Sequence, residues 1–81
     1  MNDLQRAIGR RLRKLRSKRG WTQETFAAHC GIHRAHMGDI ERGERRITII
    51  TLQKLSKGLG VSLSMLFRGI EKDLPDEANN V

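Results

Sequence analysis

The sequence lacks the features that mark secreted and membrane proteins. It contains one cysteine, Cys30, so it cannot form an intrachain disulfide, and a lone cysteine suits a reducing cytosol. No segment is long and apolar enough to span a bilayer, and residues 1–19 are too rich in arginine to resemble a signal peptide. We therefore expect a cytoplasmic protein without a membrane partner. Its 81 residues allow one small domain with a thin core.

Strand-like alternation, internal repeats and low-complexity segments are also missing, and the apolar residues recur instead at helical spacing. Capping residues and glycines divide the chain into five segments of this kind. Helices are expected over residues 3–18, 23–30, 33–42, 48–58 and 63–68. The predicted core consists of Leu4, Ile8, Leu12, Leu15, Phe26, Met37, Ile40, Leu52, Leu55, Leu59 and Leu66, with Ala27 and Cys30 in support. The sequence thus predicts an all-α, five-helix domain over residues 1–69.

Charge is distributed unevenly along the chain. Residues 1–69 carry 15 basic and 5 acidic side chains, whereas residues 70–81 carry one lysine and four acids. We expect the acidic segment 70–81 to be a poorly ordered tail. The basic excess of the domain favours a polyanionic partner, above all DNA, because neutralising phosphates releases condensed counterions. A basic surface that is merely solvated is the alternative, and charge alone does not decide between the two.

The segment 23–40 has the pattern of a helix-turn-helix. Two short helices are joined by a tight turn at Gly31, and Ala27 is small enough for the helices to cross closely. Ile32, Met37 and Ile40 supply the apolar contacts that would fix the crossing angle. This arrangement presents the second helix to the major groove of DNA. An ordinary helical hairpin in a small bundle would give a similar pattern.

A longer string of residues carries a family resemblance. The run W-T-Q-E-T-F-A-A-H-C-G-I-H-R-A-H-M-G-D-I-E-R-G, from Trp21 to Gly43, and the later L-G-V-S, from Leu59 to Ser62, resemble the Cro/phage-repressor (XRE-like) helix-turn-helix family. The resemblance implies a compact five-helix, lambda-repressor-like fold and a sequence-specific transcriptional regulator. It also implies a homodimer on a two-fold symmetric operator. The run R-R-I-T, from Arg45 to Thr48, is similar to the controller proteins of restriction-modification systems.

The same resemblance implies which residues read bases. Arg34, Ala35 and Asp39 match the outward positions of the recognition helix, and His33 and His36 lie at the same end. Arginine can bond both acceptors of guanine, a methyl group can meet thymine, and a carboxylate can accept from cytosine N4. Asp39 can alternatively pair with Arg34 or with Arg42 and only orient that arginine.

Other residues are expected to grip phosphate or to stabilise the fold. Gln23 matches a phosphate-contacting glutamine of the family. The residues expected to join it at the DNA phosphates are Thr22, Arg45, Arg46 and Thr48. The alternative for the two arginines is that they belong to a solvated charged loop. Arg6, Arg10 and Arg13 form a basic side of the first helix that either attracts DNA non-specifically or is solvated. The resemblance also pairs Arg16 with Glu41 as a structural ion pair between the first and third helices.

Apolar residues without an obvious place in the core gather after the recognition helix, where the resemblance puts the dimer contact. The expected interface consists of Ile47, Ile50, Leu63, Met65, Phe67 and Ile70. An excess of apolar side chains in one region indicates an interaction patch. The alternative is that some of them thicken the core.

Three other functions compete with DNA regulation. His29, Cys30, His33 and His36 are zinc-ligand types, but Gly31 separates them, so we expect no metal and no other cofactor. Cys30 with a neighbouring histidine resembles a catalytic dyad, but five short helices offer little pocket, so we expect no enzyme and no small-molecule ligand. An antitoxin-type module that binds both a protein and DNA is the third alternative, and fold alone does not separate it from a regulator.

Overall fold

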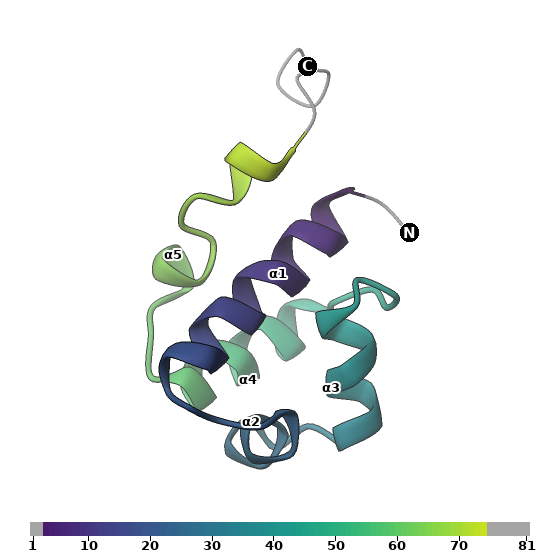
Figure 1. Ribbon diagram of the computed structural model, residues 1–81, viewed down its shortest axis with the longest axis vertical. Helices are drawn as coiled ribbons and strands as arrows, with labels where there is room; N and C mark the ends of the chain where they lie inside the picture. Colours follow the sequence, from purple (N-terminus) through teal and green to yellow (C-terminus); the bar gives the residue numbers. More distant parts are fainter. Residues whose placement is uncertain (1–2, 75–81) are drawn as a thin grey trace.

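The computed structural model describes residues 3–74, and this part of the chain contains helices and turns but no strand (Figure 1). Its elements are α1 (Asp3–Lys18), α2 (Gln23–Cys30), α3 (Arg34–Glu41), α4 (Ile49–Leu59), α5 (Leu63–Leu66) and the 3-10 helix η1 (Ile70–Asp73). The expected all-α, five-helix fold is confirmed. None of the helices in residues 3–74 has the length and apolarity needed to cross a membrane.

Side-chain caps start four of the helices. The hydroxyls of Thr22, Thr48 and Ser62 each accept a hydrogen bond from the backbone N–H three residues later, at the starts of α2, α4 and α5. Such bonds satisfy backbone donors that a helix leaves free. The recognition helix begins at Arg34 rather than at residue 33, because His33 is itself the cap and its Nδ1 accepts from Ala35 N at 3.2 Å.

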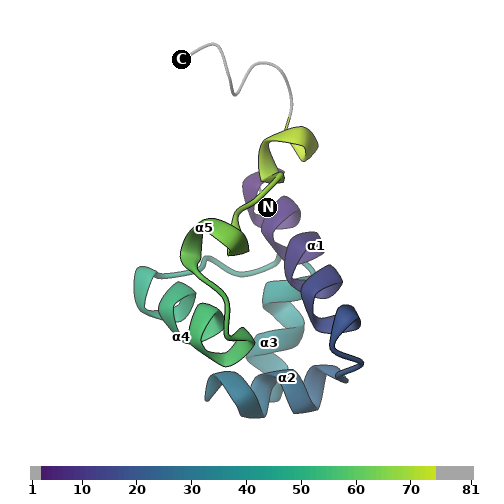
Figure 2. The same ribbon diagram turned by 90° about the vertical axis from the view of Figure 1, so that its left-hand side faces the viewer.

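Helix α1 lies between α3 and the C-terminal η1 and packs against both (Figures 1 and 2). Helix α2 packs against α3 and α4, and α4 packs against α5. The core between these elements consists of Ala7, Ile8, Leu12, Leu15, Phe26, Ala27, Cys30, Ile32, Met37, Ile40, Leu55, Leu59, Leu66 and Ile70. Nine of the eleven predicted core residues are in this set, and burial of their apolar surface supplies the main driving force for folding.

Two helical glycines allow helices to approach more closely than any other residue would permit. A Cβ atom on Gly9 of α1 would lie 2.4 Å from the carbonyl oxygen of Glu41 at the end of α3. A Cβ atom on Gly58 of α4 would lie 2.3 Å from Cys30 Sγ and 2.9 Å from Cys30 Cα. Because real Cβ contacts of this length do not occur, both helix pairs depend on the missing side chain.

Two predicted core residues lie elsewhere. Leu4 is 48% exposed, because the first turn of α1 extends past the helices that cover the rest of its apolar stripe. It borders an open hollow with Arg46 and Ile47. Leu52 is only partly buried and packs against the edge of the core.

The folded part of the chain continues beyond the expected boundary at residue 69. Residues 70–73 form η1, and Ile70, at 5% exposure, is part of the core. The sequence analysis placed Ile70 in the dimer interface. Because Ile70 is buried in the core, it is not available to an exposed patch. The rest of the expected tail, residues 75–81, lies outside the described residues.

The glycine contacts predict opposite effects for the same substitution at two sites. Gly58→Ala should destabilise the fold by about 1–3 kcal/mol, because its methyl group meets the Cys30 backbone. Gly38→Ala is the matched control, since its Cβ would meet only the flexible guanidinium of Arg42 at 3.1 Å and Gln23 Oε1 at 3.6 Å. Removing a helical glycine there should be neutral or stabilise by up to about 1 kcal/mol. Thermal melts that rank the two variants the other way round would contradict this packing.

Candidate nucleic-acid interface

The turn between α2 and α3 holds the two helices at a fixed angle. Gly31 has a φ of 66°, a left-handed conformation that glycine adopts at least cost. This turn lets Ile32 N donate to Ala27 O at 3.0 Å and buries Ile32 in the core. Ala27 is 2% exposed. Its small side chain lets the two helices cross closely. The inner face of α3 is thereby fixed, and its outer face is free.

A buried carboxylate ties α3 to α1 and α2. The side chain of Glu41 is fully buried and accepts from Arg16 Nε at 2.8 Å and from a second Arg16 nitrogen at 3.1 Å. It also accepts from Gln23 Nε2 at 3.0 Å, and Arg16 donates in addition to the carbonyl of Trp21 at 2.9 Å. The structure therefore brings Arg16 and Glu41 together as the resemblance implied.

Two further residues bond to Glu41, one partly buried and one exposed. Gln23 Nε2 donates to Glu41, and the expected contact of Gln23 with phosphate stays a prediction. Arg13 was expected on the side of α1 that either attracts DNA or is solvated. Its side chain is about half exposed, and it donates to the Glu41 carbonyl at 3.3 Å and lies 4.0 Å from the carboxylate. The three-residue spacing of Arg13 and Arg16 was the available signal, since it puts both on one side of a helix.

The first turn of α3 presents the expected base-reading residues. Arg34 and Ala35 are exposed and His36 is half-buried. Arg34 lies 3.4 Å from Glu24 of α2, and both side chains are about 70% exposed, so this pair contributes little stability and exchanges readily for another anion. His33 uses Nδ1 as the helix cap, which leaves Nε2 as the ring atom able to donate outward.

Asp39 holds two arginines at the other end of α3. Its carboxylate accepts from Arg42 at 2.5 Å and from Arg45 at 3.3 Å, whereas Arg34 pairs with Glu24 instead. Arg42 also donates to Glu44 at 3.2 Å. The hydrogen bond and charge of Glu44, with a smaller contribution from Asp39, raise the pKa of Arg42 above its usual value. This is the orienting role considered for Asp39 beside direct base contact.

The expected phosphate-binding residues form two groups. Thr22 and Thr48 are exposed, and both hydroxyls take part in helix caps. Arg45 is held by Asp39, whereas Arg46 is exposed and has no ion pair with any residue of the described chain. Arg46 is thus the more available of the two to a phosphate group.

The six residues expected at a dimer contact divide by exposure. Ile50, Leu63 and Met65 are exposed, Ile47 and Phe67 pack partly against the core, and Ile70 is buried. Ile49 was not among them, yet it is 84% exposed at the start of α4. Position 49 lies three residues before Leu52 and so on a similar side of α4, which means that helical spacing alone gave no signal for its exposure.

The histidines and Cys30 take part in separate contacts. His29 stacks on Trp21 with ring centroids 4.1 Å apart, and His33 caps α3. Among residues 3–74, no three His, Cys, Asp or Glu side chains are grouped to hold a metal ion. Burial raises the pKa of the Cys30 thiol to about 11, which favours the protonated thiol over the reactive thiolate at neutral pH.

Known proteins share this arrangement. A family model described as helix-turn-helix matches residues 12–66. Control protein C.MunI of a Mycoplasma species is 43% identical over 74 residues, which cover 90% of this chain and 100% of that relative. The restriction-modification controller protein C.AhdI from Aeromonas hydrophila superposes with a TM-score of 0.75 and 36% identity, covering 78% of this chain and 96% of that one. The controller protein C.Esp1396I superposes with a TM-score of 0.82 and 32% identity, covering 90% of this chain and 95% of that one.

The buried carboxylate generates a stability prediction. Glu41→Ala should lower the free energy of unfolding by about 3–5 kcal/mol, because it leaves the largely buried Arg16 without its partner. Glu44→Ala is the control, since it removes an exposed carboxylate that pairs with Arg42 and should cost about 1 kcal/mol or less. Urea unfolding of the two variants measures the difference. Equal losses would mean that the Arg16–Glu41 pair does not organise the fold.

Proposed function

The chain belongs to the helix-turn-helix family of DNA-binding transcriptional regulators, and on that basis we propose that it binds a palindromic operator as a homodimer with α3 of each copy in the major groove. The observation that carries this proposal is the division of α3 into two faces. Met37, Ile40 and Glu41 fix its inner face, and Arg34 and Ala35 stand exposed on its first turn. A helix held rigidly with exposed side chains at its N-terminal end suits base readout.

Base contacts and backbone contacts would come from different residues. Arg34 would bond guanine after leaving Glu24, and Ala35 and His36 would approach neighbouring bases. Arg46, together with the N-terminus of α2 capped by Thr22, would contact phosphate. Asp39 would hold Arg42 and Arg45 toward the backbone rather than read a base itself, since both arginines already bond to its carboxylate.

We propose further that the chain regulates the genes of a restriction-modification system. Support comes from its likeness to a control protein over that protein's full length and to two controller structures. DNA binding of this kind needs no cofactor and takes place in the cytoplasm, where the operator lies. A protein that co-purifies stably when the chain is expressed with its neighbouring genes would favour the antitoxin alternative instead.

Arg34 provides the test of base reading. With an operator obtained by selection from random duplexes, Arg34→Ala should cost about 1–3 kcal/mol of binding free energy and relax the preference at one base pair. Arg46→Ala is the matched control, because losing a phosphate contact weakens operator and random DNA alike and reduces the slope of affinity against salt by about one. If Arg34→Ala lost the same binding free energy on operator and on random DNA, Arg34 would be a contact to the DNA phosphate backbone and not to a base.

Exposed apolar side chains on α4 and α5 support the homodimer. These helices pack against each other (Figure 2) and expose Ile49, Ile50, Leu63 and Met65. A two-fold pairing through this surface would set the two recognition helices about 34 Å apart, one turn of DNA. One short helix reads few base pairs, so pairing two copies supplies the specificity that one lacks.

The dimer proposal is tested by placing a charge in this surface. Ile50→Glu and Leu63→Glu should each weaken self-association by roughly tenfold or more, because the carboxylate would be buried without a partner. Ala28→Glu puts the same charge on the exposed side of α2 and should leave association unchanged. Sedimentation at micromolar concentration measures the effect. A wild-type protein that stays monomeric and binds a palindrome without cooperativity would contradict the proposal.

A further inference from the structure

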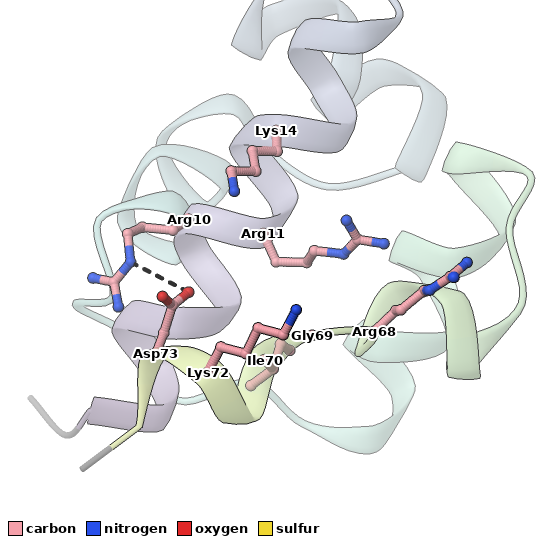
Figure 3. Close-up of a pocket in the computed structure, with 8 residues that line it drawn as sticks. All are labelled: Arg10, Arg11, Lys14, Arg68, Gly69, Ile70, Lys72 and Asp73. Atoms are coloured by element: carbon pink, nitrogen blue, oxygen red, sulfur yellow. Dashed lines mark ion pairs between the residues drawn. The ribbon is translucent and has the colours of Figure 1, made fainter.

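A basic hollow lies between α1 and η1, away from the proposed DNA-reading helix (Figure 3). Its volume is about 260 Å³. The charged side chains around it are Arg10, Arg11 and Lys14 of α1, Arg68 after α5, and Lys72 and Asp73 of η1. Asp73 is the one acid among the described residues that line it, so five cations surround a single carboxylate.

The hollow and α3 occupy different sides of α1. Gly9, Arg13 and Arg16 are the α1 residues that contact Glu41 of α3, whereas the hollow opens toward η1. Figures 1 and 2 likewise place α3 and η1 on different sides of α1. A ligand in the hollow would therefore not compete directly with a duplex lying against α3.

Most of the charge in the hollow is uncompensated by the residues that the structure describes. Arg11 is committed to structure, since it donates to the carbonyls of Met65 at 2.7 Å and Leu66 at 3.3 Å. Arg10 and Asp73 form only a loose pair at 3.8 Å, with both side chains about half exposed. The other three cations, Lys14, Arg68 and Lys72, have no ion pair within residues 3–74. Like charges gathered in this way repel one another, and a bound anion relieves the repulsion.

The shape of the hollow selects the class of anion. Its cations come from α1, from η1 and from Arg68 in the segment between α5 and η1, and Lys72 reaches from η1 toward α1 (Figure 3). Its volume is below the 300–1,000 Å³ common for drug-sized ligands. The described lining contains no aromatic side chain on which a base could stack. Lysine and arginine groups around a small space match the oxygen atoms of phosphoryl groups.

We propose that this hollow binds a compact phosphoryl anion of the pyrophosphate type, contrary to the expectation that the chain has no small-molecule ligand. Lys14 and Lys72 bind it from opposite sides, Arg68 adds charge at the rim, and Arg10 turns from Asp73 to the anion. Asp73 opposes binding because its carboxylate lies beside the site. Since the anion bridges α1 and η1, it also stabilises the attachment of η1 to the domain.

Titration of the free protein with pyrophosphate at constant ionic strength, followed by backbone amide NMR, tests the proposal. We expect one saturable event centred on the amides of Gly69 to Lys72 and of α1 around Lys14. Lys14→Gln and Lys72→Gln should each weaken binding by roughly two- to fivefold, the range that partly exposed charge pairs give. Asp73→Asn should strengthen it by a similar factor. Lys54→Gln, which removes an exposed charge from α4, is the matched control and should change nothing.

Two further measurements separate this site from general attraction to a basic protein. Pyrophosphate binding that Lys54→Gln weakens as much as Lys14→Gln, or that Asp73→Asn leaves unchanged, would overturn the proposal. So would equally tight binding of a short glutamate peptide, because the site would then sense charge alone. If the anion is free in solution, pyrophosphate still binds the operator complex, and Lys14→Gln leaves the salt dependence of DNA binding unchanged. If the phosphoryl group belongs to a DNA backbone, Lys14→Gln instead reduces that slope by about one.

Discussion

The buried carboxylate of Glu41 is the constraint on which the rest of the structure depends. A charge removed from water is tolerated only where partners replace the lost solvation, and here those partners come from two other helices. Arg16 binds both carboxylate oxygens from α1, and Gln23 donates from the start of α2. Few positions of α3 allow all these bonds at once. The cluster therefore fixes the direction in which the outer face of α3 points.

Close backbone contacts complete this fixation. Gly9 brings α1 against the Glu41 carbonyl, and Gly58 brings α4 against Cys30 at the end of α2. These contacts fix α1, α2 and α4, whereas the exposed ion pairs around α3 are not fixed in the same way. Arg34 with Glu24 and Arg45 with Asp39 lie on the surface at 3.3–3.4 Å, where water and ions compete for both partners. The buried cluster is thus rigid, and the groups proposed to meet DNA can exchange partners at little cost.

The helices and their ends were predictable from the sequence because they depend on local chemistry. Thr22 and Gly31 act through bonds to their immediate neighbours, and the spacing of Leu12 and Leu15 is a property of one helix. The positions of Leu4, Gln23 and Ile70 depend on tertiary neighbours instead. Leu4 lies beyond the reach of the other helices, and Gln23 meets a glutamate 18 residues away. Ile70 follows a glycine that looked like a terminus, yet it meets α1 and completes the core.

The same distinction bears on how the basic character of the chain should be interpreted. Several arginines that contribute to the excess charge of residues 1–69 are occupied within the fold. Arg11 caps the end of α5, Arg19 donates to the carbonyl of Leu59 at the end of α4, and Arg13 and Arg16 bond around Glu41. Carbonyl groups at helix ends carry partial negative charge, so a guanidinium that bonds to them stabilises the fold and is less available to an anionic ligand. The number of phosphates that the protein neutralises must therefore be well below its count of basic residues. What remains includes two surfaces with separate sets of cations, the α3 side and the hollow beside η1.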